Sequence, residues 1–235
     1  MLKQIDNNFW VKEHSQKYFG LEVGTRMNVI RLDKGSIILI SPIELSEKTI
    51  AEIKILGEVE HLIAPNLFHY LYLRSCQEVY PDALTTVPQG LDKKASLEKY
   101  QVYSQDALNF GKELEHFQFG GFAVPLPTGI KELNEVVFFH RASRSLILTD
   151  LAFHFDSSFP FITRFTSYVL GCYDKLRPSI LEKLVIKNRP EVETSIKRIL
   201  QWNFRRVVMA HGTIIDKDAK QRLKQGYEWF LNRSL

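Results

Sequence analysis

Three short apolar segments of the chain are each followed by side chains that can bind metals or move protons. Sites in α/β proteins form just past the carboxyl ends of buried strands, and such segments are typical of these strands. Two imidazoles and one carboxylate are a common ligand set for Zn²⁺ or Fe²⁺. The segments and their polar residues are Leu62–Ala64 with Asn66 and His69, Leu146–Thr149 with Asp150, and Val207–Ala210 with His211. The sequence therefore indicates one candidate site built from all three segment ends.

Each of these residues also has a purely structural interpretation. Asp150 could cap a turn, His69 could start a helix, and His211 could be a half-buried histidine with satisfied hydrogen bonds. The structural interpretation is favoured for each residue alone. Their shared position at strand ends makes a joint site an equal alternative.

Two other histidines and two arginines are weaker candidates. His154 lies four residues after Asp150 and could hydrogen-bond to it on the side away from a metal. His140 is expected to open an exposed hairpin beside Arg141 and Arg144, which could hold an anionic group.

The elements that position these residues combine hairpins with strand–helix–strand units. Met27–Leu32 and Ser36–Ile40 flank a turn sequence and are expected to pair as a hairpin. A helix capped by Ser46 and ended by Gly57 then leads to a strand over Val59–Ala64, which is typical of a parallel pair. The mixture predicts an α/β protein with two mixed sheets and helices outside.

The expected strands and helices along the rest of the chain are consistent with one domain over residues 1–235. Residues 88–117 show no firm hydrophobic periodicity. One expected helix, over Phe161–Tyr173, has Ile162, Phe165 and Val169 in register on one face. Strands are also expected over Ala83–Val87, Phe119–Val124, Glu135–Phe139, Leu146–Thr149 and Arg206–Ala210, and helices over His69–Tyr80, from Pro190, and after an Asp216 cap.

Composition and charge limit the class of protein. The 235 residues are 45% hydrophobic and 25% charged, which is ordinary for a soluble globular chain. The net charge of +4 is too small to indicate a polyanionic partner. Residues 174–206 carry nine Lys and Arg against four Asp and Glu, but such a segment is usually a solvated helical face. Nucleic acid is therefore not an expected partner.

Cysteine usage and the lack of apolar runs point to the cytoplasm. Cys76 and Cys172 are isolated thiols with no metal or disulfide spacing, as in reduced intracellular proteins. Met1–Trp10 lacks a signal-peptide pattern. No apolar run approaches the roughly 18 residues that a membrane span needs. We expect a cytoplasmic protein without membrane contact.

Several of these segments resemble an uncharacterised family placed in the metallo-β-lactamase superfamily. The resemblance extends over nearly the whole chain. It rests on Arg26–Leu32, Ser41-Pro42, Leu56–Leu73, Tyr80–Ala83, Asn134–His140, Leu148–Leu151 and Met209–Gly212. It implies an αββα sandwich, with two facing sheets, helices outside and a site at one edge.

The resemblance also implies which metal ligands are kept and which are lost. When the last histidine of the superfamily motif H-x-H-x-D-H is placed on His69, the other three positions hold Ala64, Asn66 and Phe68. Asp150 and His211 match the later aspartate and the final histidine of the superfamily. The third histidine would fall within residues 131–135, where Glu135 is the only substitute considered, and Ser41-Pro42 replaces an early aspartate.

These changes argue against a two-metal hydrolase. The slightly favoured hypothesis is a mononuclear metal-dependent hydrolase with His69, Asp150 and His211 as ligands to one Zn²⁺ or Fe²⁺ ion, acting on an unidentified small molecule. In it Glu135 is a further candidate ligand, and Asn66 joins Asp150 in catalysis by orienting water or substrate. The alternative is a metal-free, inactive binding or scaffold protein on the same fold. A nucleic-acid-binding relative is a weaker third hypothesis.

Overall fold

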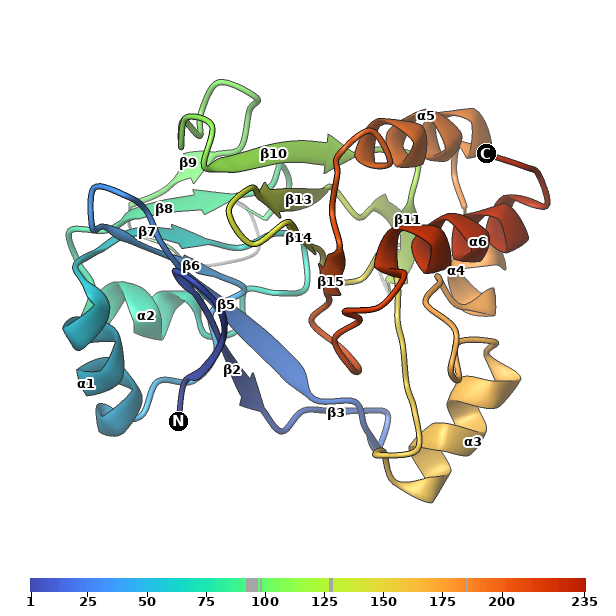
Figure 1. Ribbon diagram of the computed structural model, residues 1–235, viewed down its shortest axis with the longest axis horizontal. Coiled ribbons are helices and arrows are strands. Elements are labelled where there is room, and N and C mark those ends of the chain that lie inside the picture. Colours follow the sequence, from blue (N-terminus) through green and yellow to red (C-terminus); the bar gives the residue numbers. More distant parts are fainter. Residues whose placement is uncertain (92–96, 98, 127–128, 185) are drawn as a thin grey trace.

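Two β-sheets face each other in the computed structural model, with helices on both outer sides (Figure 1). The structure describes residues 1–91, 97, 99–126, 129–184 and 186–235. Part of the 88–117 segment therefore lies outside the described residues. Within the described chain, no helix has the length and apolar character needed to cross a membrane.

The first sheet has seven strands, antiparallel at one end and parallel at the other. The hairpin predicted from Met27–Ile40 is confirmed, as is the parallel pair that encloses the first helix. In sheet order the strands are β1 (Lys3–Asp6), β2 (Phe9–His14), β5 (Thr25–Arg31), β6 (Ile37–Ile40), β7 (Val59–Ile63), β8 (Leu84–Val87) and β9 (Gln101–Val102).

The second sheet has four strands and is also mixed, because its last pair is parallel. The strand predicted over Phe119–Val124 was wrong, since the chain leaves the sheet at Phe119 and residues from Ala123 form a separate hairpin. The sheet order is β10 (Leu114–Phe119), β13 (Glu135–His140), β14 (Ser145–Ile147) and β15 (Arg206–Val208). Two small hairpins are β3 (Lys17–Tyr18) with β4 (Leu21–Glu22), and β11 (Ala123–Leu126) with β12 (Gly129–Glu132).

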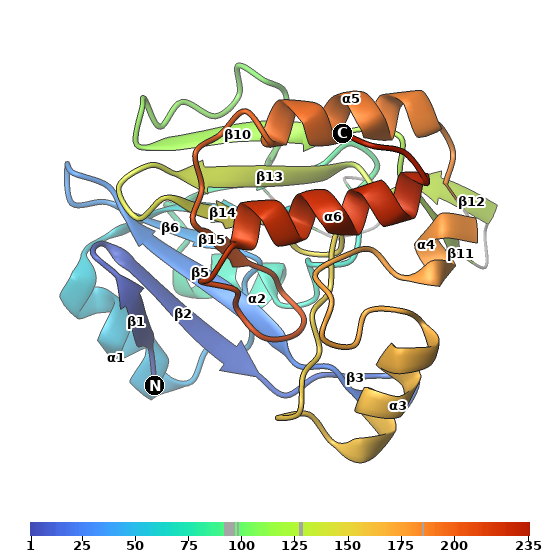
Figure 2. The same cartoon turned by 45° about the vertical axis from the view of Figure 1, so that its right-hand side comes forward.

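The helices divide between the two outer faces, as Figure 2 shows. α1 and α2 cover the first sheet, while α5 and α6 cover the second. Their bounds are α1 (Glu47–Leu56), α2 (Leu73–Val79), α3 (Phe161–Val169), α4 (Ile180–Leu184), α5 (Arg189–Ile199) and α6 (Ala219–Leu231).

Three apolar clusters account for the layers. One joins the facing sides of the two sheets and includes Ile38, Ile63, Phe138 and Val208. The other two fill the spaces between each sheet and its helices. Strands with alternate residues buried on both sides are expected of a four-layer arrangement. The predicted αββα sandwich is confirmed.

One of the two predicted helix caps is confirmed. Ser46 caps α1 by accepting a hydrogen bond from the Thr49 N–H. Asp216 does not cap α6, which begins after Asp218; the Asp216 carboxylate instead accepts a hydrogen bond from Arg206 Nε. Asp216 lies two residues before Asp218, the N-cap residue of α6, and is therefore not at the helix end.

Candidate metal centre

Two histidines and an aspartate meet where strands of both sheets end. His69 follows β7 of the first sheet, whereas Asp150 and His211 follow the parallel pair β14 and β15 of the second. One ligand atom from each of the three side chains lies within 4.8 Å of the others. The structure thus brings together the residues that the strand ends selected, and their role as ligands remains a prediction.

The spacing of these atoms suits a shared cation. Asp150 Oδ1 lies 3.4 Å from Nε2 of His69 and 3.4 Å from Nε2 of His211. Charge-assisted hydrogen bonds are shorter, at about 2.7–2.9 Å. Bonds of about 2.0–2.1 Å to a tetrahedral Zn²⁺ place neighbouring ligand atoms roughly 3.4 Å apart. The two imidazole–carboxylate distances therefore match the edges of a tetrahedral site better than they match ion pairs.

The second ring nitrogen of each histidine is held by the protein. His211 Nδ1 lies 2.5 Å from the carbonyl oxygen of Gly24, which can only accept, so this nitrogen carries the proton. Its Nε2 is then the nitrogen that faces Asp150. His69 Nδ1 lies 2.8 Å from Ser41 Oγ. Such contacts orient metal-binding imidazoles and fix their tautomer.

Sequence reasoning missed the part that Ser41 and Gly24 play. Ser41 was noted only as the residue that replaces an aspartate, although its place directly after β6, beside β7, was a usable signal. Gly24 acts through its backbone carbonyl, and no side chain in the sequence indicates that contact.

Asn66 connects Asp150 to the strands behind it. Its amide nitrogen lies 2.7 Å from Asp150 Oδ2, 2.9 Å from Glu135 Oε2 and 2.9 Å from Thr149 Oγ1. Its amide oxygen accepts hydrogen bonds from the Phe68 and His69 N–H groups. Asn66 is completely buried and contacts Asp150 directly, and its expected role in orienting water or substrate stays a prediction.

Asp150 is an anion in this setting. Burial alone would raise the pKa of its carboxyl group, but His69 and His211 outweigh burial and hold the pKa well below its usual range. A carboxylate beside two imidazoles is a suitable ligand for a divalent cation.

Glu135 lies behind Asp150, outside the group of converging ligand atoms. Its Oε1 accepts a hydrogen bond from the Thr149 N–H at 2.7 Å, and its Oε2 accepts one from the Asp150 N–H at 2.8 Å. Burial and the nearby charge of Asp150 raise its pKa to about 7. Since both oxygens are engaged, the geometry does not support the ligand role considered for Glu135.

We expect Glu135→Gln to destabilise the protein by about 2–3 kcal/mol, because the new NH₂ group must face an N–H donor. Urea unfolding measures this loss. Because of this raised pKa, Glu135 binds a proton more tightly in the folded protein than in the unfolded chain. Its contribution to the free energy of unfolding is therefore present at low pH and falls as the pH rises through 7. The stability difference between the two proteins should therefore be smaller at about pH 8 than at about pH 5.

Glu60→Gln is the matched control. Glu60 is exposed and pairs with Lys34, so the change should cost no more than about 0.5 kcal/mol. Equal stabilities for wild type and Glu135→Gln would show that the buried carboxylate does not carry these hydrogen bonds.

The turn that presents His211 is fixed by a buried arginine and a glycine. Arg26 donates to the carbonyl oxygens of Met209 and Gly212, the latter at 2.9 Å. Gly212 has a φ of 97°, and a Cβ there would lie 2.2 Å from the carbonyl oxygen of His154. Only glycine tolerates both the conformation and the close approach.

The other candidate residues lie outside the centre. His140 is buried and bonds to Ser143 Oγ at 2.8 Å, so the expectation of an exposed histidine was wrong. Arg141 pairs with Glu115, and Arg144 contacts Asn203, both at the β13–β14 turn, the opposite end of β14 from Asp150.

His154 does not support Asp150 through its ring. Its Nε2 lies 2.8 Å from Arg222 and 3.5 Å from Asp174. Its backbone carbonyl instead accepts a hydrogen bond from the Thr213 N–H, beside the turn that presents His211. His154 therefore contributes to the site only through its backbone.

Two of the three changed motif positions, Ala64 and Phe68, are apolar. Ala64 is buried in the cluster between the first sheet and its helices. Phe68 packs against the core of the second sheet. Neither side chain offers a ligand atom, in keeping with a single-metal centre.

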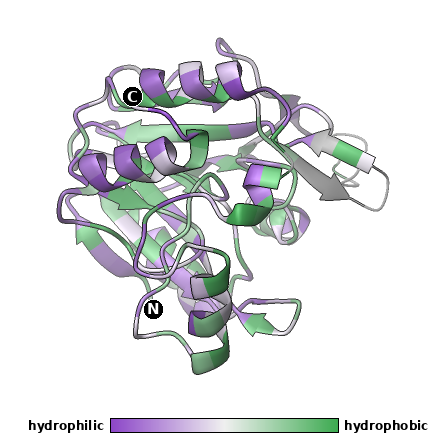
Figure 3. Ribbon diagram, turned by 90° about the vertical axis from the view of Figure 1, so that its right-hand side faces the viewer, coloured by the Kyte–Doolittle hydropathy of each residue, from purple (hydrophilic) through white to green (hydrophobic). Residues whose placement is uncertain are grey.

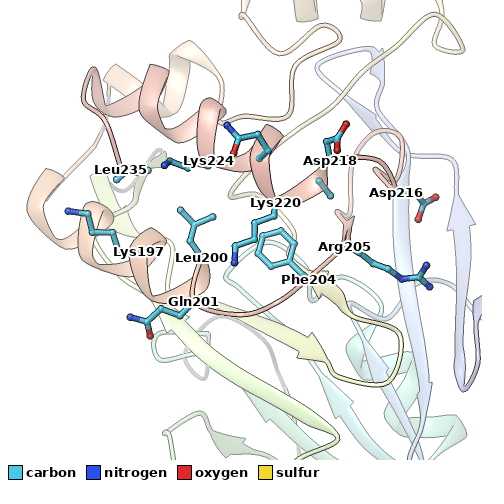
Figure 4. Close-up of a pocket in the computed structure, with 12 residues that line it drawn as sticks. Lys197, Leu200, Gln201, Phe204, Arg205, Asp216, Asp218, Lys220, Lys224 and Leu235 are labelled. Carbon is cyan, nitrogen blue, oxygen red and sulfur yellow. The ribbon is translucent and has the colours of Figure 1, made fainter.

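Four of the nine basic residues in the 174–206 segment form ion pairs within the chain. Lys187 pairs with Glu132, Lys197 with Glu193, and Arg206 with Asp6. A hollow of about 650 Å³ between α5 and α6 has basic side chains, but Asp216 and Asp218 lie among them (Figure 4). This mixture of charges does not form the continuous basic surface that nucleic-acid binding requires.

Comparisons with known proteins agree with the fold and the resemblance. A family model described as a domain of unknown function, DUF4336, matches residues 6–175, more than half of the chain. The chain belongs to the DUF4336 family. No curated protein matches this DUF4336 chain.

Solved structures show that the DUF4336 chain has the metallo-β-lactamase fold. A metallo-β-lactamase from Pontibacter korlensis aligns with a TM-score of 0.65 and 14% identity, covering 99% of this chain and 98% of that one. The Flv1 flavodiiron core from Synechocystis sp. PCC6803 aligns at 0.67 and 14%, covering 99% and 60%. Rubredoxin oxygen:oxidoreductase from Desulfovibrio gigas aligns at 0.65 and 11%, covering 99% and 61%. At these identities the likeness concerns the fold alone.

Proposed function

We propose that this DUF4336 protein is a mononuclear metal-dependent hydrolase in which His69, Asp150 and His211 hold one divalent ion. The observation that carries the proposal is the convergence of these three side chains, whose ligand atoms all lie within 4.8 Å of one another. His211 directs Nδ1 to the Gly24 carbonyl and Nε2 to Asp150 Oδ1 at 3.4 Å. The two-histidine, one-carboxylate set suits Zn²⁺ and Fe²⁺ alike.

Bound by three protein ligands, Zn²⁺ would act as a Lewis acid and lower the pKa of a coordinated water to about 7. The chain's own residues prepare the site for this chemistry. Ser41 and the Gly24 carbonyl orient the imidazoles, and Asn66 holds Asp150 from behind. Asp150 and His211 are partly exposed, at 18% and 16%, so a small-molecule substrate can approach from that side.

The proposed functional unit spans residues 1–235 as one domain. The family match ends at residue 175, but β15 completes the second sheet by pairing with β14, and His211 follows β15.

We also propose a cytoplasmic location. Cys76 and Cys172 are free and buried, and burial raises the pKa of each thiol to about 12, as suits unreactive cysteines in a reducing compartment.

We expect the metal-stripped protein to bind one equivalent of Zn²⁺ or Fe²⁺ per chain, measured by titration against a chromogenic chelator. Binding to the folded state alone stabilises it by about 2.7 kcal/mol at free metal near 100 times Kd. For a chain of this size, that corresponds to a rise in Tm of roughly 5–10 °C. Excess chelator should reverse the rise.

His116→Gln is the control for this titration. His116 is a half-buried histidine that contacts Tyr103 and the Leu108 carbonyl, away from the centre, so the variant should bind metal as wild type does. Absence of stoichiometric binding would favour the metal-free binding protein. Two equivalents bound with equal strength would contradict the single-metal site.

A further inference from the structure

Helix α3 presents its apolar side to solvent and its polar side to the protein. Thr163 and Ser167 are buried, whereas Phe161 and Tyr168 are each 74% exposed. Thr163 Oγ1 donates to the Glu22 carbonyl at 3.0 Å, which anchors the polar side on strand β4. The usual arrangement for a surface helix is the reverse.

Two elements that neighbour α3 also carry exposed apolar side chains. The β3–β4 hairpin lies beside α3 in both ribbon views and carries Tyr18 and Phe19, the latter 91% exposed (Figures 1 and 2). α4 begins where the Ile180 N–H bonds to the Leu170 carbonyl just past α3. The lowest helix in Figure 3, α3, shows the same apolar stretches in green. We call the α3 surface the set Tyr18, Phe19, Phe161, Ile162, Phe165, Tyr168, Val169, Ile180, Leu181 and Leu184.

The α3 surface is larger than a monomer normally exposes. Five of its members are aromatic. With about 150–250 Å² for each aromatic side chain, the exposed area of the set is on the order of 1,000 Å². The largest apolar patch of a typical monomer is about 300–600 Å². A standard interface buries about 800 Å² on each partner, so one interface would cover this surface.

We propose that the α3 surface is a two-fold interface between two copies of this chain. An isologous contact places the same patch against itself, so it requires a surface without strong charge of one sign. The only charged residue of α3 is Arg164, which stacks on Tyr173 of its own chain. Two α3 helices can therefore meet without repulsion.

A lipid surface fits the same patch less well. Interfacial helices combine an apolar side with free Lys and Arg that reach anionic headgroups. Here Lys183 bonds to the Trp229 carbonyl and lies over its ring, and Lys187 pairs with Glu132. The cations of and just after α4 are thus engaged within the chain, which leaves Lys17, exposed beside Tyr18, as a single cation at the edge of the set in the described part of the chain.

Formation of this interface would not require metal. It would, however, help to hold a segment that contacts the candidate metal centre. The β3–β4 hairpin leads to Gly24, whose carbonyl holds His211 Nδ1. A second copy packed on Tyr18 and Phe19 would restrain that hairpin.

The test is the mass of the full chain in solution, by sedimentation equilibrium at micromolar concentrations. We expect a species of twice the chain mass of 27.3 kDa. Phe165→Glu, at a position 60% exposed, should fold normally and weaken dimerisation by at least about 100-fold, because two carboxylates would be buried face to face. Mixing Phe165→Glu with Phe165→Lys should restore dimers.

Ile55→Glu is the matched control, since Ile55 is 85% exposed on α1, and it should leave the dimer intact. Circular dichroism would verify that each variant is folded. A monomeric wild type, or a dimer that survives Phe165→Glu, would overturn the proposal. So would a monomer that binds phosphatidylserine vesicles through Phe165, because the patch would then be a lipid surface.

Discussion

Asp150→Asn is expected to weaken metal binding by at least about 1,000-fold, or about 4 kcal/mol. The new side chain keeps the shape of the carboxylate. Its oxygen can still accept from Asn66, and its NH₂ group takes the place of the oxygen that lies 3.4 Å from both imidazoles. A divalent ion would then lose its anionic ligand.

The effect of metal on stability separates the two leading hypotheses. In both, His69 and His211 stabilise the Asp150 carboxylate when metal is absent, so the amide should lower the Tm of the chelated protein. If the centre is a metal site, added metal raises the Tm of wild type but not that of Asp150→Asn. Thermal unfolding with and without chelator measures both quantities. A wild-type Tm that does not respond to metal would favour the metal-free protein.

Gly212→Ala should destabilise the protein by about 3–5 kcal/mol, which corresponds to a fall in Tm of roughly 10 °C. The backbone there has a φ of 97°, and the added Cβ would meet the His154 carbonyl oxygen at 2.2 Å. Because the obstacle is backbone, the turn itself must shift, and His211 shifts with it. Metal affinity should therefore fall together with stability.

Gly35→Ala is a close control for that substitution. Gly35 has a φ of 94° but no atom within 4 Å of an added Cβ, so the change should cost only about 1–2 kcal/mol. The difference between the two variants measures the steric contact alone. If Gly212→Ala proved no worse than Gly35→Ala, the tight packing of the 211–213 turn on His154 would be refuted.

Local patterns were sufficient for most of the fold. The hairpin of β5 and β6 and the cap of α1 by Ser46 depend on neighbours in sequence, and both were predicted correctly. The Asp216 cap was wrong because α6 begins only after Asp218, and the Asp216 carboxylate bonds to Arg206 of β15 instead. The exposure of the apolar side of α3 could not be predicted either, because periodicity identifies an apolar side without specifying what it faces.

The sequence by itself selected His69, Asp150 and His211, because the carboxyl ends of buried strands gather at one edge whatever the details of packing. Only the tertiary structure decided which nitrogen of each imidazole faces the site. The ring orientations follow from Ser41 Oγ, which contacts His69, and from the carbonyl of Gly24, which lies 187 positions from His211. It also decided that Asn66 and Glu135 stand behind the site and not in it. Residue type does not indicate which backbone carbonyl contacts an imidazole or how deeply a side chain is buried. Both are determined only when the two sheets pack together.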